Sequence, residues 1–127
     1  MAQMAMDVTA EEMTVYRATA RRRWERKKRE SALRRERAWQ VARRAARLLK
    51  EQLGATHVAV FGSLVRKGSF HRRSDVDLAV WGLDERMYYR AVSRLLDLDP
   101  AISVDLVEAD SARPALRAAI KREGVPL

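Results

Sequence analysis

The sequence of residues 58–81 is VAVFGSLVRKGSFHRRSDVDLAVW. Both ends of this stretch have the apolar, β-branched character of buried strands, and a Gly-Ser pair and an Asp-x-Asp pair stand between them. Side chains alternate between the two faces of a strand, so Asp75 and Asp77 project from one face while their apolar neighbours project from the other. The pattern predicts strands at 58–61 and 75–81, with polar chemistry where they meet the intervening loop.

The residue types in this loop point to one kind of chemistry. Two carboxylates on one face repel each other unless a cation lies between them. Carboxylate oxygens suit Mg²⁺, which takes its remaining ligands from water and from substrate phosphates. A turn such as Gly62-Ser63 can present backbone N–H groups and a hydroxyl to those phosphates. The constellation therefore indicates metal-assisted phosphoryl or nucleotidyl transfer.

The chain is strongly basic, with a net charge of +9, and the excess lies in its first part. Residues 1–50 carry fifteen Lys/Arg against six Asp/Glu, whereas residues 51–127 carry eleven of each. Residues 17–37 are charged on nearly every side, while residues 38–53 repeat apolar positions at helical spacing. This asymmetry predicts a basic appendage joined to a neutral domain.

Length and composition exclude several classes of protein. With 127 residues the chain is expected to form one domain, and with no cysteines it has neither disulfides nor thiolate metal sites. No apolar run is long enough to span a membrane, and the N-terminus lacks the order of a signal peptide. We therefore expect a soluble, cytoplasmic protein that does not associate with membranes.

The first part of the chain reads as helix. Asp7 or Thr9 can cap it, and no proline or glycine follows until after Leu53. One long helix or two stacked helices satisfy this pattern. Gly54 is well placed to end it, because glycine readily adopts the left-handed conformation after a helix.

The second part alternates strands and helices. After the strand at 75–81, Asp84 can cap a helix, and a third strand is expected at 102–107. Ser111 is the expected N-cap of a final helix that ends at Gly124. The order helix, strand, turn, strand, helix, strand, helix predicts an α/β layered fold.

Taken together, these motifs resemble a minimal nucleotidyltransferase of the DNA polymerase β superfamily. Its signature is Gly-Ser, a spacer, Asp-x-Asp, and a third acid on a later strand, here Asp105. The resemblance covers roughly residues 38–127. It implies a small mixed β-sheet flanked by helices with the acids at one edge. Residues 1–37 then form a long basic N-terminal helical extension.

The resemblance also implies roles for individual residues. Three acids are the expected catalytic residues and the ligands of two Mg²⁺ ions, with ATP as substrate: Asp75, Asp77 and Asp105. Three residues are expected to bind the nucleotide: Gly62, Ser63 and Arg66. Asp105 can also accept the proton of the attacking hydroxyl. The family usually has glycine directly after the arginine, but here Lys67 intervenes before Gly68, which leaves the path of the loop open.

Minimal enzymes of this type are similar to the MntA-like antitoxins of HEPN/MNT toxin–antitoxin modules. That likeness implies transfer of AMP from ATP to a tyrosine of a HEPN ribonuclease toxin, with which the chain forms an oligomer. Three alternatives stay open. They are a non-catalytic antitoxin, nucleotidyl transfer to a small molecule such as an aminoglycoside, and a nucleic-acid-binding module that uses the basic residues 17–37.

Overall fold

A computed structural model describes residues 8–127, so the predicted cap at Asp7 lies outside the described part. The chain divides into two units, Met1–Leu33 and Arg34–Leu127. The described part of the first unit is helical from Ala10, where helix α1 (Ala10–Gln52) begins. Thr9 caps it, because its hydroxyl oxygen accepts the Glu12 N–H at 3.0 Å. Of the two arrangements that the sequence pattern allows, the structure has one long helix.

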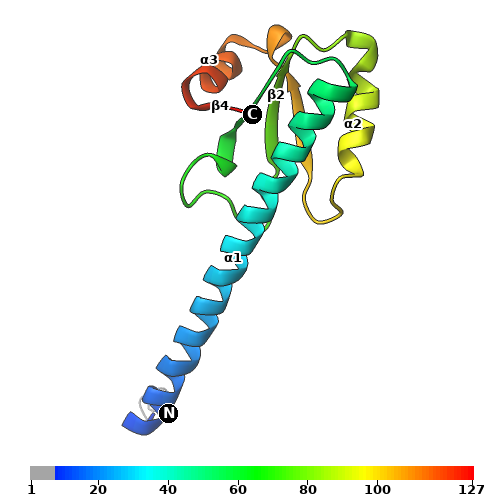
Figure 1. Ribbon diagram of the computed structural model, residues 1–127. Coiled ribbons are helices and arrows are strands. Elements are labelled where there is room, and N and C mark those ends of the chain that lie inside the picture. The colour runs from blue at the N-terminus through cyan, green and yellow to red at the C-terminus, as the bar shows by residue number, and fades with distance from the viewer. Residues whose placement is uncertain (1–7) are drawn as a thin grey trace, which may run out of the picture. The chain divides into compact units, whose positions relative to one another are not determined.

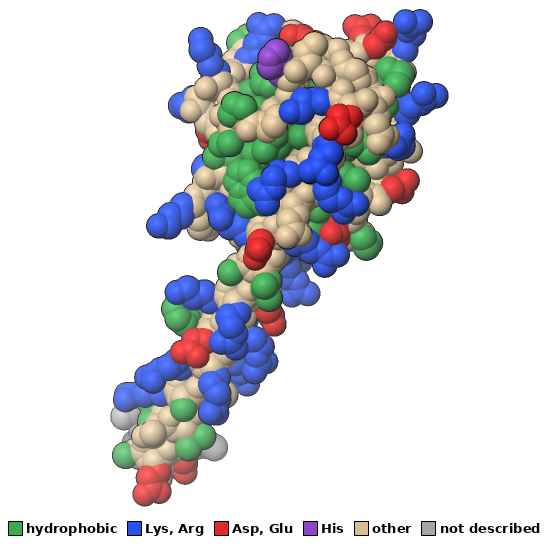
Figure 2. All heavy atoms as spheres, in the orientation of Figure 1, with side chains coloured by type: hydrophobic (Ala, Val, Ile, Leu, Met, Phe, Trp, Pro, Cys, Tyr) green, Lys and Arg blue, Asp and Glu red, His purple; other side chains and the backbone are tan. Residues whose placement is uncertain are grey.

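The described helix of the first unit has no buried residue. Its large apolar side chains are exposed, Trp24 at 61% and Leu33 at 66%. Eight Lys and Arg side chains lie between residues 17 and 29, and Figure 2 shows them along this helix. A helix without a buried face depends on its capping and charge pattern or on a partner.

Within the second unit, α1 acquires a buried face. Ala38, Val41, Ala45 and Leu49 repeat at helical spacing and are fully or almost fully buried. The helix ends as predicted: Gly54 has φ of +81°, and Ala55 donates its N–H back to the carbonyl of Leu49 at 3.0 Å.

The sheet has four strands in the order β3-β2-β1-β4, as Figure 1 shows. The strands are β1 (His57–Phe61), β2 (Val76–Trp81), β3 (Val104–Glu108) and β4 (Val125–Pro126). β1 pairs antiparallel with β2 and β4, whereas β2 and β3 are parallel. The sheet is therefore mixed, as predicted. The short strand β4 was not predicted.

Two helices follow the strands. Asp84 caps a 3₁₀ turn, Glu85–Met87, by accepting the N–H of Arg86 at 2.9 Å, and α2 (Tyr88–Leu96) continues from it. This segment supplies the crossover that two parallel strands require.

The final helix, α3 (Pro114–Glu123), begins later than expected, and the prediction that Ser111 caps it is wrong. Ser111 ends a separate 3₁₀ turn, Ala109–Ser111. Helix α3 starts at Pro114, whose fixed φ and missing N–H suit the first helical position.

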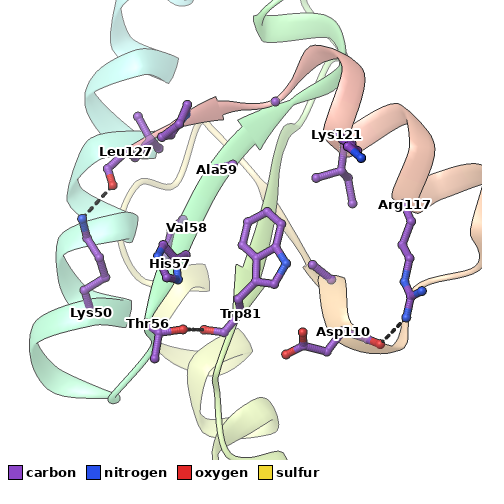
Figure 3. Close-up of a pocket in the computed structure, with 14 residues that line it drawn as sticks. Lys50, Thr56, His57, Val58, Ala59, Trp81, Asp110, Arg117, Lys121 and Leu127 are labelled. Carbon is purple, nitrogen blue, oxygen red and sulfur yellow. Dashed lines mark hydrogen bonds between the residues drawn. The ribbon is translucent and has the colours of Figure 1, made fainter.

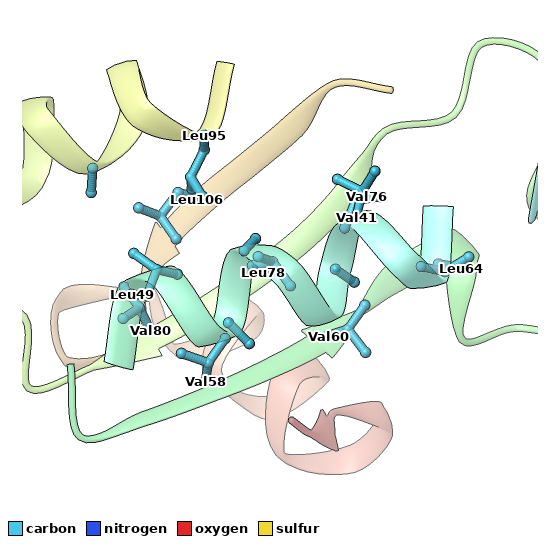
Figure 4. Close-up of a cluster of buried hydrophobic side chains, with 14 of the residues drawn as sticks. Val41, Leu49, Val58, Val60, Leu64, Val76, Leu78, Val80, Leu95 and Leu106 are labelled. Carbon is cyan, nitrogen blue, oxygen red and sulfur yellow. The ribbon is translucent and has the colours of Figure 1, made fainter. Parts of the chain in front are cut away.

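The core lies on the face of the sheet that α1 and α2 cover. Val60, Val76, Leu78 and Val80 point toward these helices and are at most 1% exposed, as Figure 4 shows. A Leu78→Ala substitution would remove roughly 2–5 kcal/mol of stability here. On the opposite face, α3 packs against Phe61 and Ala79 through Ile120. No helix among residues 8–127 is both long and apolar enough to cross a membrane.

Candidate active site

Two of the predicted acids lie side by side on the face that α3 partly covers. Asp77 of β2 is directly opposite Asp105 of β3 in the parallel register. Neighbouring strands are about 4.8 Å apart, so the two carboxylates lie within reach of one ion. Asp75 precedes β2 and is exposed, two residues from Asp77 and therefore on the same side of the chain.

The Gly-Ser turn lies directly against Asp77. Strand β1 ends at Phe61, the pairing partner of Asp77, and the 3₁₀ turn Gly62–Leu64 follows at once. Gly62 has φ of +78°, and a Cβ at this position would overlap the Asp77 carboxylate. Only glycine meets both conditions, because it tolerates the left-handed region and leaves room beside the acid. Ser63, the next residue, is half-buried in the same turn.

Arg66 leaves the end of this turn, where its N–H donates to the carbonyl of Gly62 at 3.3 Å. Its side chain is 60% exposed. The guanidinium can therefore reach a phosphate bound at the turn without being buried beforehand.

Glu123 joins this group, and the sequence analysis gave it no role. It is the last residue of α3, and its Oε1 accepts the N–H of Gly62 at 3.2 Å. Its Oε2 lies 3.6 Å from Nε of Arg66. An acid at the end of a helix, before Gly124 and a short apolar segment, was the only local signal. Glu123 and Gly62 are 61 positions apart in the chain, so no local sequence pattern predicts their contact.

The charges at this site converge on Asp77. Its pKa is raised from 3.8 to about 6, first because the carboxyl is partly buried and then because Asp105 and Asp75 are negative. Arg66 acts in the opposite direction, and Glu123 adds to the rise. The free protein thus holds a concentration of negative charge that a cation would neutralise.

The donor set fits a hard divalent cation. Its oxygens come from carboxylates at one end of the sheet, and the absence of a side chain at Gly62 lets the Asp77 carboxylate lie against the turn. Among residues 8–127, however, no three His, Cys, Asp or Glu side chains are already arranged to hold a metal ion. The Mg²⁺ ligation by Asp75, Asp77 and Asp105 stays a prediction.

Comparison with known families identifies the chain. Residues 44–127 match the family described as polymerase beta, nucleotidyltransferase. The chain belongs to this family. No curated protein matches this nucleotidyltransferase.

Solved structures share its fold. A mutant of the toxin–antitoxin MntA-HpeT is 25% identical, with a TM-score of 0.57 over 67% of this chain and 70% of that one. A toxin–antitoxin with AMP-PNP is 28% identical, with a TM-score of 0.54 over 63% of this chain and 66% of that one. A third structure, with a TM-score of 0.52 and 22% identity over 70% of each chain, supports the fold alone. It is a tri-AMPylated Shewanella oneidensis HEPN toxin in complex with MNT antitoxin.

Arginines of α1 brace the loops of the nucleotidyltransferase site. Arg35 donates from Nη2 to the carbonyl of Leu64, in the Gly-Ser turn, at 3.3 Å. Arg34 donates from Nη1 to the carbonyl of Ala101, before β3, at 3.0 Å. Both residues fall within the segment 1–37 that the sequence analysis assigned to the extension. The division at residue 37 stays a prediction, but Arg34 and Arg35 belong to the second unit and contact its loops.

A separate cavity of about 650 Å³ lies farther along the same face of the sheet, as Figure 3 shows. Trp81 lines it, four residues beyond Asp77 on β2, or about 13 Å at the rise of an extended strand. Ala59 and Ile120 form part of its apolar lining, and Lys121 lies at its edge. None of the predicted site residues lines this cavity.

Proposed function

We propose that this protein is a Mg²⁺-dependent nucleotidyltransferase that transfers AMP from ATP to a hydroxyl of a partner protein. The observation that carries the proposal is the juxtaposition of Asp77 with Asp105 and of the Gly62 turn with Asp77. It places paired carboxylates beside a turn that can donate to phosphate. Family membership independently supplies the class of reaction.

The roles follow from the geometry. Gly62 N–H, the Ser63 hydroxyl and the Arg66 guanidinium bind the phosphates. Asp75, Asp77 and Asp105 hold the metal. Bound there, Mg²⁺ neutralises charge on the phosphates and on the leaving pyrophosphate.

The reaction itself needs one proton acceptor. The acceptor hydroxyl oxygen bonds to the α-phosphorus of ATP, and the bond from that phosphorus to its bridging oxygen breaks. Pyrophosphate leaves with the electron pair, and the hydroxyl proton passes to Asp105, which is exposed and next to Asp77. Catalysis in this scheme comes from positioning and charge neutralisation rather than from a covalent intermediate.

The partner in this proposal is a HEPN-type ribonuclease toxin, modified on a tyrosine hydroxyl and thereby silenced, so that the chain acts as its antitoxin in the cytoplasm. Support comes from the fold shared with toxin–antitoxin structures, one of which contains AMP-PNP. The apolar cavity beside Trp81, with Arg117 and Lys121 around it, offers a surface for such an acceptor on the same face of the sheet as the acids.

Intact-mass spectrometry tests this function. A HEPN-type toxin is incubated with ATP, Mg²⁺ and either the wild-type protein or the double variant Asp75→Ala/Asp77→Ala. We expect a gain in steps of one nucleotide monophosphate with the wild type only. A tight complex without any gain in mass would instead show an antitoxin that acts by binding alone. If the two proteins formed no complex, the acceptor would instead be a small molecule.

A second candidate activity rests on the exposed basic helix. Eight Lys and Arg side chains between residues 17 and 29 can neutralise nucleic-acid phosphates without reading sequence. In that case, affinity for a single-stranded RNA should fall by orders of magnitude between about 50 and 200 mM salt. The triple variant Arg21→Gln/Arg22→Gln/Arg23→Gln should bind more weakly and show a shallower salt slope. Unchanged affinity in this variant would remove the candidate.

A further inference from the structure

One carboxylate accepts a hydrogen bond from the Gly-Ser turn and forms an ion pair with the arginine that follows it. Glu123 accepts the Gly62 N–H at 3.2 Å with Oε1, and its Oε2 lies 3.6 Å from Nε of Arg66. Its side chain is only 23% exposed, whereas that of Arg66 is 60% exposed. The Glu123 carboxylate therefore sits against the inside of the turn, where solvent reaches it least.

These donors are the ones that a nucleotide would need. A backbone N–H in a glycine turn and a guanidinium fork bind carboxylate and phosphate oxygens by the same charge-assisted hydrogen bonds. The Gly62 N–H cannot donate to a phosphate oxygen while it donates to Glu123, and the Glu123 carboxylate offsets the positive charge that Arg66 would offer to a phosphate. Two like-charged groups competing for one pair of donors exclude each other.

The contact also has a use when no nucleotide is bound. Gly62 is buried and held at positive φ, and an unsatisfied N–H at such a position would be costly. Glu123 satisfies that N–H and draws Arg66 toward the turn. The turn is thus kept in its donor-presenting conformation by an anion of the protein's own.

We propose that Glu123 is an internal stand-in for a substrate phosphate: it holds the Gly62–Arg66 turn in the nucleotide-free protein and is displaced when the triphosphate binds. Glu123 is then a positioning residue that lowers affinity for nucleotide in exchange for a preformed turn. This inference rests on the proposed nucleotide binding and adds a residue that sets its strength.

The test measures AMP-PNP affinity by calorimetry in the presence of Mg²⁺. In the Glu123→Gln variant the amide oxygen can still accept the Gly62 N–H, but the competing charge is gone. We expect AMP-PNP to bind this variant about five- to tenfold more tightly than the wild type. The matched control is Glu36→Gln, which removes one negative charge from an exposed position of α1. Its affinity should equal that of the wild type.

The outcomes separate the two proposals. If the wild type binds AMP-PNP and Glu123→Gln binds equally or more weakly, Glu123 is a structural brace and the inference is overturned while the function stands. If neither protein binds AMP-PNP, both proposals fail.

A measurement on the wild type alone covers the case of a variant that does not fold. The side-chain carboxylate ¹³C resonance of Glu123 should move toward the position of a solvated glutamate when AMP-PNP is added. A Glu123 resonance that stays fixed while AMP-PNP binds would overturn the inference.

Discussion

Asp77 and Asp105 face each other across two parallel strands that are 28 residues apart in sequence, and each is the other's register partner. Parallel pairing requires a crossover, here through α2, so the two acids meet only when the sheet has assembled. Their proximity, with that of Asp75, concentrates negative charge at the end of the sheet. This negative charge is what would bind a metal ion, and in the metal-free protein its repulsion lowers the free energy of unfolding.

Neutralising Asp77 should therefore stabilise the metal-free protein while removing its activity. The Asp77 pKa of about 6 in the folded protein exceeds the unfolded value of 3.8. The contribution of the protonated Asp77 carboxyl to the free energy of unfolding is therefore fully present below pH 3.8 and is lost as pH rises through 6. The difference between these two pKa values corresponds to roughly 3 kcal/mol, and partial exposure of the carboxyl reduces this to about 1 kcal/mol. Urea unfolding at pH 7 in EDTA should show Asp77→Asn to be more stable by about that amount.

The charge-matched control for this prediction is again Glu36→Gln, which should leave the unfolding free energy within about 0.5 kcal/mol of the wild type. The stability of Asp77→Asn should also vary less between pH 4 and pH 7. An Asp77→Asn protein that is less stable than the wild type at pH 7 would show that the carboxylate is favourably paired rather than repelled.

Gly62→Ala and Gly68→Ala form a matched pair. Both glycines have positive φ, +78° and +75°, so both substitutions should lose about 1 kcal/mol to backbone strain. Only at position 62 does the new Cβ meet the Asp77 carboxylate, since nothing lies within 4 Å at position 68. We expect Gly62→Ala to lose more stability, by about a further 1–3 kcal/mol, and to lose AMP-PNP binding. If Gly62→Ala and Gly68→Ala lost equal stability, the Asp77 carboxylate would be able to move away from the new Cβ at no cost in free energy.

Arg35 should act on nucleotide affinity through the turn. Its Nη2 donates to the Leu64 carbonyl at 3.3 Å, and one hydrogen bond of this kind contributes about 0.5–1.5 kcal/mol. Arg35→Gln should weaken AMP-PNP binding about three- to tenfold in calorimetry. Arg43→Gln, which removes an exposed charge from the same helix, should bind like the wild type. Equal weakening in both variants would point to net charge rather than to the turn.

Asp99 should contribute stability that depends on pH. Arg37 donates to its two oxygens, from Nε at 2.6 Å and from Nη2 at 2.9 Å, and this pairing holds the Asp99 pKa below its usual value. A lowered folded-state pKa gives stability above the unfolded value, which is lost as pH falls through the folded value. Asp99→Asn should be less stable at pH 7 by about 1 kcal/mol, because the pair is partly exposed.

Thermal unfolding between pH 3 and pH 7 checks this prediction. The difference in melting temperature between the wild type and Asp99→Asn should become smaller below about pH 4, where the wild-type carboxyl takes up a proton. A difference that stays constant over this range would assign the effect to the hydrogen bond from Ala101 to Asp99 rather than to the charge.

Local sequence patterns were enough to predict most of the helices and strands and the residue types of the candidate site. Alternation placed Asp77 on the face opposite Leu78, the helical repeat of Ala38 to Leu49 marked the buried face of α1, and Gly54 marked its end. These signals are local, because strand and helix periods act over a few residues. Where two local signals competed, as at Ser111 and Pro114, the prediction of the helix start was wrong.

Which residues meet at the site depends on how the sheet and helices assemble. Register set Asp77 opposite Asp105, the packing of α3 brought Glu123 onto Gly62, and the docking of α1 brought Arg35 to the Gly-Ser turn. Each contact joins elements that are distant in the chain, and no periodicity of a single segment encodes strand order or helix placement. The types of residue at the site could therefore be predicted from the sequence. Their assembly into one site follows from the burial of apolar side chains on both faces of the sheet.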